Sequence, residues 1–207
     1  MASPERKESL IENRAVLVDV DNTINNLQVD LLKYVNRRLP HPYSYRGFTS
    51  ADMESTDTLF DQIGAEFFNS PELVIKSRPF PGALDAIRLL DEKGFEVHIA
   101  SGRHGILHQT TTQWLEKHGF LPHVSSVHHR PPEKSVQDFK IGVAKKVDAV
   151  VAFDDIRSVA EALSSNGITV HLIRRPWNKE VEKSDLIRPY PSFYRAVVAF
   201  IDTYASL

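Results

Sequence analysis

Four aspartates occur in two close pairs, and each pair ends a short apolar run: Asp19 with Asp21, and Asp154 with Asp155. If folding brings the pairs together, their carboxylates repel one another unless a cation compensates. Mg²⁺ is a hard cation that takes oxygen ligands, typically one or two carboxylates together with water and phosphate oxygens. The residue types therefore predict a magnesium site with all four aspartates as candidate ligands.

Apolar, valine-rich runs predict the strands that must position these side chains, at residues 15–20, 95–100, 124–127, 149–153 and 168–173. Segments with helical spacing separate or follow them, around residues 81–94, 106–119, 159–167 and 190–204. This alternation predicts an α/β fold, a Rossmann-like parallel sheet flanked by helices on both faces. Ligands bind such sheets beyond the carboxyl ends of the strands, where both aspartate pairs and Ser101 fall.

The segment between the first two strands breaks this alternation. It contains two helix-like pieces, at residues 27–39 and 58–68, joined by a loop with Tyr43, Tyr45 and Phe48. We expect a core domain of residues 1–25 and 80–207, with residues 26–79 forming a small helical insert over the active edge. The loop aromatics either build the core of the insert, which is favoured for Phe48, or stack on a substrate.

The composition narrows the class of protein. The chain has 207 residues, 42% of them hydrophobic and 25% charged, which suits one globular core with an insert. The net charge of −2 argues against a protein that grips nucleic-acid backbone, and the absence of cysteine excludes disulfides and thiolate chemistry. The polar N-terminus and the lack of a stretch of ~20 apolar residues favour a cytoplasmic protein with no membrane partner.

Taken together, these motifs resemble those of the haloacid dehalogenase (HAD) superfamily. The resemblance rests on Asp19-Val-Asp21-Asn-Thr23, Ser101 after a strand, a downstream lysine, and Phe153-Asp154-Asp155. It covers about residues 14 to 175 and implies a HAD-like core whose insert resembles a C1-type cap. Two further stretches, Arg78-Pro-Phe-Pro-Gly82 and Arg175-Pro-Trp-Asn178, resemble the 5'(3')-deoxyribonucleotidase branch, although Asn22-Thr23 stands where that branch has Gly-Val.

The resemblance implies a magnesium-dependent phosphomonoester hydrolase. Asp19 would attack phosphorus and form an aspartyl-phosphate, and Asp21 would protonate the leaving group and then activate water. Thr23 would support the loop, while Ser101 and the following Gly102 would bind phosphoryl oxygens. The substrate would be a small phosphorylated molecule, with a nucleotide as the leading class.

The resemblance also implies how the ion is held. Mg²⁺ would bridge Asp19, the backbone carbonyl of Asp21, and Asp154 or Asp155. Arg157, two residues beyond the acidic pair, is a candidate for a salt bridge that anchors one of these carboxylates.

The resemblance requires a lysine beside the phosphoryl group, near the start of the helix before the fourth strand. If Asp138 caps that helix, Lys140 lies in its first turn, whereas a start at Ser135 favours Lys134. We prefer Lys140.

Other polar residues have weaker claims to a role. Arg103 and His104 follow Ser101 and either contact substrate or lie in a solvated loop. His128 and His129 are adjacent on a predicted strand, so their side chains point to opposite faces and do not chelate one ion.

Two other readings remain open. One is a 3'-phosphatase acting on nucleic-acid ends, like the phosphatase domain of polynucleotide kinases, and the other is a non-catalytic HAD-like binding module. We expect no stable nucleic-acid partner. The aromatic face of the C-terminal helix packs either on the sheet or in a homodimer.

Overall fold

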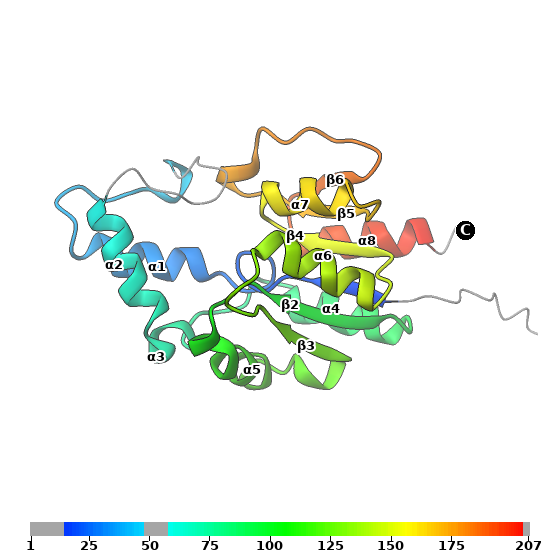
Figure 1. Cartoon of the computed structure of the whole chain (residues 1–207), viewed down its shortest axis with the longest axis horizontal. Coiled ribbons are helices and arrows are strands. Elements are labelled where there is room, and N and C mark those ends of the chain that lie inside the picture. Colours follow the sequence, from blue (N-terminus) through cyan, green and yellow to red (C-terminus); the bar gives the residue numbers. More distant parts are fainter. Residues whose placement is uncertain (1–14, 48–57, 205–207) are drawn as a thin grey trace, which may run out of the picture.

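The computed structural model describes residues 15–47 and 58–204, in which six strands form one parallel sheet with the order β3-β2-β1-β4-β5-β6 (Figure 1). The strands are β1 (Ala15–Val18), β2 (Glu96–Ser101), β3 (Ser126–His129), β4 (Val151–Asp154), β5 (Val170–Ile173) and β6 (Ile187–Tyr190). The predicted Rossmann-like α/β architecture is confirmed. Its cause is a set of short apolar strands, each linked to the next through a segment that contains helix.

Helices cover both faces of the sheet, and the alternating side chains of β1 show how. Val16 and Val18 join a core with α4 (Ala83–Glu92), α5 (His108–Lys117) and α8 (Phe193–Tyr204). Leu17 points to the other face and joins a second core with α6 (Val136–Lys146) and α7 (Arg157–Ser164). The aromatic face of α8 is buried in the first core, so its packing on the sheet is confirmed.

The strand order reverses between β1 and β4. From β1 the chain adds β2 and β3 on one side, and from β4 it adds β5 and β6 on the other. The register aligns Val18 with Phe153, and the Asp19 N–H donates to the Phe153 carbonyl at 3.0 Å. The next residue of each strand is acidic, so the fold itself places Asp19 beside Asp154 at the point where such sheets bind ligands.

Helices α1 (Leu27–Asn36), α2 (Thr58–Phe68) and α3 (Pro71–Val74) lie beyond the ends of the strands (Figure 1). They enclose a third apolar cluster, in which the Tyr43 ring meets the edge of Phe60 with centroids 5.0 Å apart. Leu107 and Trp177, from outside this segment, complete the cluster. Tyr43 is therefore core-forming, while Phe48 lies outside the described residues. The division at residues 26 and 79 stays a prediction.

The strand bounds differ in part from the sequence-based prediction. β3, β4 and β5 each begin two residues later than expected, and β6 was not expected at all. β6 contains Pro189 and sits at the edge of the sheet, where a residue without an N–H is tolerated, so its sequence carries no strand pattern. Within residues 15–47 and 58–204, four one-turn 3₁₀-helices lie in the connections, at Tyr45–Gly47, Gly105–Leu107, Leu121–His123 and Pro176–Asn178.

None of the helices in the described part of the chain combines the length and the apolar character needed to cross a bilayer.

A buried histidine makes the fold sensitive to acid. The ring of His171 on β5 packs against Tyr190 and Phe153, and Nδ1 donates to the Ala196 carbonyl at 3.0 Å. Burial lowers the pKa of His171 from 6.5 to about 4, while the bond to Ala196 opposes this shift. Between these two values the unfolded chain binds a proton that the folded chain does not, so this group makes stability fall as the pH falls.

We therefore expect the free energy of unfolding to decrease from pH 6.5 to pH 4 less steeply in His171→Asn than in the unaltered protein. The difference should be on the order of 3 kcal/mol across the window. Urea unfolding at several pH values measures it. His41→Asn, at an exposed position, is the control and should keep the steep slope. Equal slopes in all three proteins would contradict the assignment.

Candidate active site

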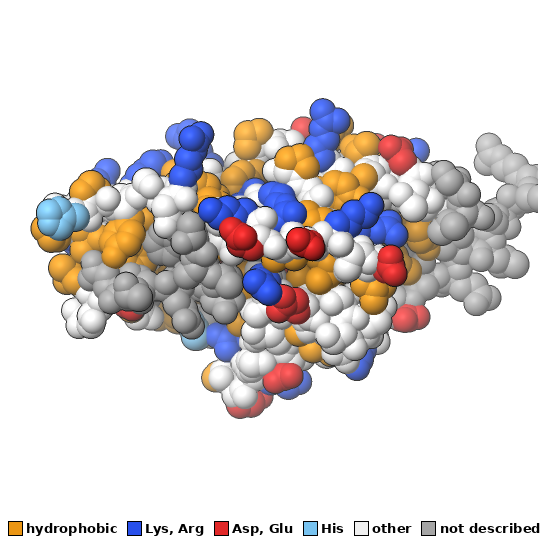
Figure 2. Space-filling view, turned by 90° about the horizontal axis from the view of Figure 1, so that it is seen from above, with side chains coloured by type: hydrophobic (Ala, Val, Ile, Leu, Met, Phe, Trp, Pro, Cys, Tyr) orange, Lys and Arg blue, Asp and Glu red, His pale blue; other side chains and the backbone are white. Residues whose placement is uncertain are grey.

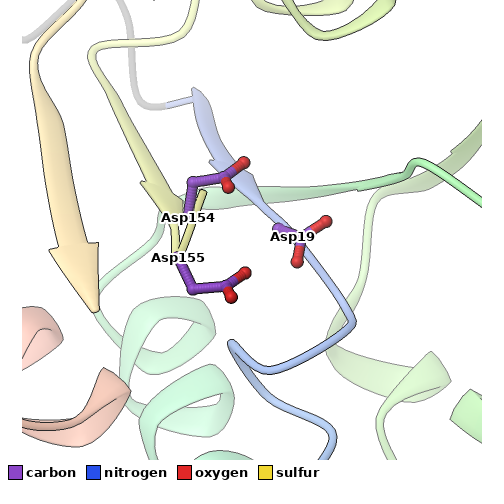
Figure 3. Close-up of side chains that lie close together, drawn as sticks. All are labelled: Asp19, Asp154 and Asp155. Atoms are coloured by element: carbon purple, nitrogen blue, oxygen red, sulfur yellow. The ribbon is translucent and has the colours of Figure 1, made fainter. Parts of the chain in front are cut away.

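Three carboxylates meet beyond the ends of β1 and β4. Asp19, Asp154 and Asp155 are all buried, and each offers an oxygen within 4.8 Å of the others. Figure 3 shows the side chains of Asp154 and Asp155 directed from the strand end toward Asp19. The sequence placed both aspartate pairs at this edge, and the structure brings three of the four carboxylates into one cluster.

The ammonium group of Lys140 lies between two of these carboxylates. Its Nζ donates to Asp19 Oδ1 at 2.7 Å and to Asp154 Oδ2 at 2.6 Å, and the side chain is buried. Lys140 thus occupies the position that we expected of it, and Lys134 is exposed in the loop before α6. Ion pairs this deeply buried are costly to break, because either partner alone would remain an unpaired charge.

The helix that carries Lys140 begins earlier than expected. Ser135, rather than Asp138, is the N-cap, and its Oγ accepts the Asp138 N–H at 3.0 Å while donating to the Asp138 carboxylate at 2.7 Å. The inference that this start would favour Lys134 was wrong. Side chains in a helix lean toward its N-terminus, so a long lysine in the second turn still reaches the strand ends.

The charges in the cluster do not balance. Burial raises the pKa of Asp19 to about 7, with Lys140 acting in the opposite direction and Asp154 and Asp21 adding to the rise. Burial also raises the pKa of Asp155 well above its usual range, reinforced by Asp19 and Asp154. Burial disfavours the charge on Lys140, yet Asp154 and Asp19 together raise its pKa. Lys140 is hydrogen-bonded to only two of the three carboxylates, and Arg175 opposes the rise for Asp155 only in part, so a divalent cation would supply further positive charge.

The oxygen atoms of the acidic pair are used differently. Asp154 accepts Lys140 on one oxygen and the Ile156 N–H, at 2.9 Å, on the other. Asp155 accepts the Trp177 indole N–H at 3.0 Å on Oδ2, while its buried Oδ1 has no hydrogen-bond partner in the described part of the chain. An orphaned carboxylate oxygen beside Asp19 fits the oxygen preference of Mg²⁺. Of the two, Asp155 has an oxygen without any hydrogen bond among the described residues, whereas each oxygen of Asp154 accepts one.

Asp21 has a different environment from the other three aspartates. Arg103 grips its carboxylate with two bonds, from Nε at 2.8 Å and from Nη2 at 2.6 Å, and also donates to Thr111 Oγ1 at 3.1 Å. Asn25 adds a bond at 3.2 Å. The Asp21 side chain is 24% exposed and lines a cavity, so it is held where it can meet a ligand. Its carboxylate is not among the three that lie within 4.8 Å of one another, so the predicted part of Asp21 in metal binding rests on its backbone carbonyl and stays a prediction.

The loop after β1 is held by the two stretches that resembled the deoxyribonucleotidase branch. Asn22 has a φ of 59°, in the left-handed region where glycine is favoured and asparagine is the best-tolerated alternative, so it can stand in for Gly. Arg175 donates to the Asn22 carbonyl at 2.7 Å and lies over the Phe80 ring at 4.2 Å. Thr23 is fully buried under the loop, and its hydroxyl has no hydrogen-bond partner among the described residues.

The loop after β2 forms one wall of the cavity that Asp21 lines. Ser101 is buried at the strand end, and its Oγ accepts the Arg103 N–H at 3.4 Å. Gly102 lines the cavity, where an added Cβ would meet Val136 at 3.2 Å, so the backbone approaches α6 closely. Arg130 holds this loop by donating to the Gly102 carbonyl at 2.8 Å and to His104 Nδ1 at 3.0 Å.

These walls enclose a cavity of about 370 Å³ between the strand ends and helices α1 and α2. Asp19, Asp21, Lys140 and Asp155 line its floor. Arg103 and His104, which the sequence left undecided between substrate contact and a solvated loop, both line it as well.

Some residues lie elsewhere than expected, and others were missed. Arg157 does not anchor the acidic pair, because it starts α7 pointing outward and pairs with Glu161 at 2.7 Å. His128 bonds the hydroxyl of Ser126, and His129 stacks on His108, so the two rings do face different surroundings. Sequence reasoning missed Gln28, which lines the cavity, and the contact of Trp177 with Asp155. Only the position of Gln28, just after the first motif and at the start of the insert, could have pointed to it.

Comparisons with known proteins agree on the fold. No protein-family model matches the chain. A protein of Bacillus cereus, provisionally named a nucleotidase, is 21% identical over 169 residues, which are 79% of this chain and 87% of that protein.

Solved structures resemble the chain over nearly its full length. A predicted phosphatase from Clostridium acetobutylicum has a TM-score of 0.68 at 12% identity, covering 94% of this chain and 99% of that one. A haloacid dehalogenase-like hydrolase from Streptococcus pneumoniae has a TM-score of 0.65 at 15% identity, covering 91% and 98%. A Bacillus subtilis HAD-hydrolase bound to magnesium has a TM-score of 0.59 at 13% identity, covering 90% and 98%. The chain therefore has the HAD-like fold.

Lys140→Met tests the charge balance of the cluster. Without the ammonium, the carboxylates of Asp19 and Asp154 lose their partner, and we expect unfolding to become easier by roughly 3 kcal/mol in the absence of metal. Thermal unfolding measures the loss, and added Mg²⁺ should restore more stability to the variant than to the unaltered protein. Lys146→Met, at an exposed position on the same helix, is the matched control. Equal losses in the two variants would refute the role of Lys140.

Proposed function

We propose that the protein is a magnesium-dependent phosphomonoester hydrolase that acts through an aspartyl-phosphate on Asp19. The observation that carries the proposal is the buried cluster of Asp19, Lys140, Asp154 and Asp155. This cluster borders a cavity at the point between β1 and β4 where the strand order of the sheet reverses. The likeness to HAD-like hydrolases and a phosphatase supports it at the level of the fold.

In the first step an Asp19 oxygen attacks phosphorus, and the bond from phosphorus to the leaving oxygen breaks. Asp21 gives that oxygen a proton, so the leaving group departs as a neutral alcohol. In the second step Asp21 takes a proton from water, the water oxygen attacks phosphorus, and the Asp19 carboxylate is released with inorganic phosphate. Asp19 and Asp21 line the same cavity, as these two reaction steps require.

The remaining groups of the site would position the phosphoryl group and neutralise negative charge. Asp19, Asp155 and the backbone carbonyl of Asp21 would hold Mg²⁺, which supplies positive charge to the phosphoryl oxygens when bound. Lys140 would neutralise Asp19 and bind a phosphoryl oxygen, and Ser101 and Gly102 would bind the others. Asp154 would hold Lys140 in place, and because each of its oxygens already accepts a hydrogen bond, we prefer Asp155 to it as the ligand of the ion.

Arg103 determines where Asp21 can act. Its two bonds hold the carboxylate, and its buried bond to Thr111 holds the guanidinium in turn. A carboxylate held in this way points one oxygen at the leaving group without searching among rotamers, which is how positioning contributes to rate.

A small phosphorylated molecule is the substrate class, and a nucleotide leads within it. The B. cereus relative provisionally named a nucleotidase supports this choice, as do the two stretches that hold the loop after β1. For the alternative of a nucleic-acid end we would expect a basic track, yet Figure 2 shows basic side chains interspersed with acidic ones on the face that it presents. A non-catalytic module is disfavoured, because every group that the chemistry needs is present. The cytoplasmic location and the homodimer stay predictions.

Asp19→Asn tests the nucleophile. An amide cannot attack phosphorus, so we expect magnesium-dependent phosphate release from nucleoside monophosphates to fall by about three orders of magnitude or more. Phosphate release is measured with and without EDTA. Asp85→Asn, which removes an exposed carboxylate on α4, should leave turnover unchanged. Normal turnover by the Asp19→Asn variant would show that Asp19 is not the nucleophile. If the unaltered protein released phosphate from none of the phosphomonoesters tested, the proposed enzymatic activity itself would be rejected.

Asp21→Asn tests the leaving-group acid. For an alkyl phosphate, whose alkoxide leaves poorly, kcat/KM should fall by about 10²–10⁴-fold. For para-nitrophenyl phosphate, whose phenolate needs no proton, kcat/KM should fall far less. The ratio of the two losses is the measurement, and equal losses for both substrates would rule out an acid role for Asp21.

A further inference from the structure

An unpaired amide lies where the cavity meets the insert. Gln28 is the second residue of α1, its side chain lines the cavity, and it is 1% exposed. Its Nε2 has no hydrogen-bond partner within residues 15–47 and 58–204. The Gln28 backbone N–H donates to Asn22 Oδ1 at 3.1 Å, which ties the start of α1 to the loop after β1. A buried donor without a partner is unfavourable, so an occupant of the cavity that offered an acceptor to this amide would remove that cost.

The walls around this amide are mostly apolar. They come from the insert and from the core alike: Leu27 and Phe68 on one side, and Leu107, Val136 and Ile156 on the other. A ligand with a flat or apolar body buries its surface against such walls, whereas a chain of hydroxyl groups would lose its bonds to water without replacing them.

The cations of the cavity are already paired. Arg103 is bound to Asp21, and Lys140 is bound to Asp19 and Asp154. His104 accepts a bond from Arg130 on Nδ1 at 3.0 Å, so that nitrogen is already engaged.

The insert side of the cavity also lacks a counter-ion for a second anion. The described lining from α1, from α2 and from the residue after α2 is uncharged, consisting of Leu27, Gln28, Ala65, Phe68 and Asn69. An anion placed beyond the phosphoryl group would therefore lose its hydration and remain without a positive partner.

We propose that the cavity selects phosphomonoesters whose leaving group is uncharged, largely flat or apolar, and able to accept a hydrogen bond from Gln28, and that it rejects leaving groups carrying a carboxylate or a second phosphate. This inference rests on the proposed phosphatase function and narrows its substrate class. A nucleoside 5'-monophosphate with a neutral base satisfies the description. A phosphorylated hydroxy acid and a nucleoside bisphosphate do not.

Two phosphate esters of nearly equal shape test the effect of a charge on the leaving group alone. In para-carbamoylbenzyl phosphate and para-carboxybenzyl phosphate the reacting bond is the same, and only the remote group changes from a neutral amide to a carboxylate. We expect the unaltered protein with Mg²⁺ to hydrolyse the carbamoyl ester with a kcat/KM at least about tenfold higher. Benzyl phosphate, which lacks a remote acceptor, should fall below the carbamoyl ester, because it leaves the Gln28 amide unpaired.

Variants at position 28 test the residue. Gln28→Lys places a cation on this wall and should raise kcat/KM for the carboxy ester relative to the carbamoyl ester by about tenfold or more. Gln28→Leu should abolish the preference for the carbamoyl ester over benzyl phosphate. Gln62→Lys, which adds the same charge at an exposed position on α2 outside the cavity lining, is the control and should leave both ratios unchanged.

The outcomes separate the two proposals. If the carboxy ester is hydrolysed as well as the carbamoyl ester, or if only esters other than these benzyl phosphates are turned over, the selectivity is refuted while the phosphatase function stands. If no phosphomonoester releases phosphate in the presence of Mg²⁺, both proposals fail.

Discussion

The ammonium of Lys140, placed between Asp19 and Asp154, is the interaction on which the site depends. It joins three elements that are distant in sequence, because Asp19 ends β1, Asp154 ends β4 and Lys140 comes from α6. Two carboxylates this deeply buried would not remain side by side without it. Since this ammonium bonds only two of the three buried carboxylates, the third, Asp155, keeps an oxygen that a cation could take.

Much of this arrangement could be predicted from the sequence, because strand ends in a parallel sheet obey simple geometry. The apolar run before Asp19 and the one before Asp154 had to be buried strands, and an acidic residue at the end of each had to reach the same edge. Lys140 was also identified, although for a reason that the helix cap at Ser135 did not support. The position was right because a lysine side chain is long enough to tolerate an error of a few residues in the helix start.

What could not be predicted depends on contacts between distant residues of ordinary type. Nothing in the sequence distinguishes the pair formed by Arg103 and Asp21 from an arginine in a solvated loop. β6 was missed because a short edge strand containing a proline carries no alternation. The unpaired amide of Gln28 depends on which neighbours fail to contact it, and an absent contact leaves no trace in a pattern of residue types.

The indole of Trp177 belongs to two structures at once. Its ring lies in the apolar cluster of α1 and α2, with Tyr45 against its edge at 5.9 Å between centroids, and its N–H is bonded to Asp155. The insert and the acidic cluster are therefore structurally coupled, because the apolar cluster of the insert contains Trp177, and Trp177 orients Asp155. A change in how the insert packs would therefore displace the Trp177 ring and, through its N–H, the carboxylate of Asp155.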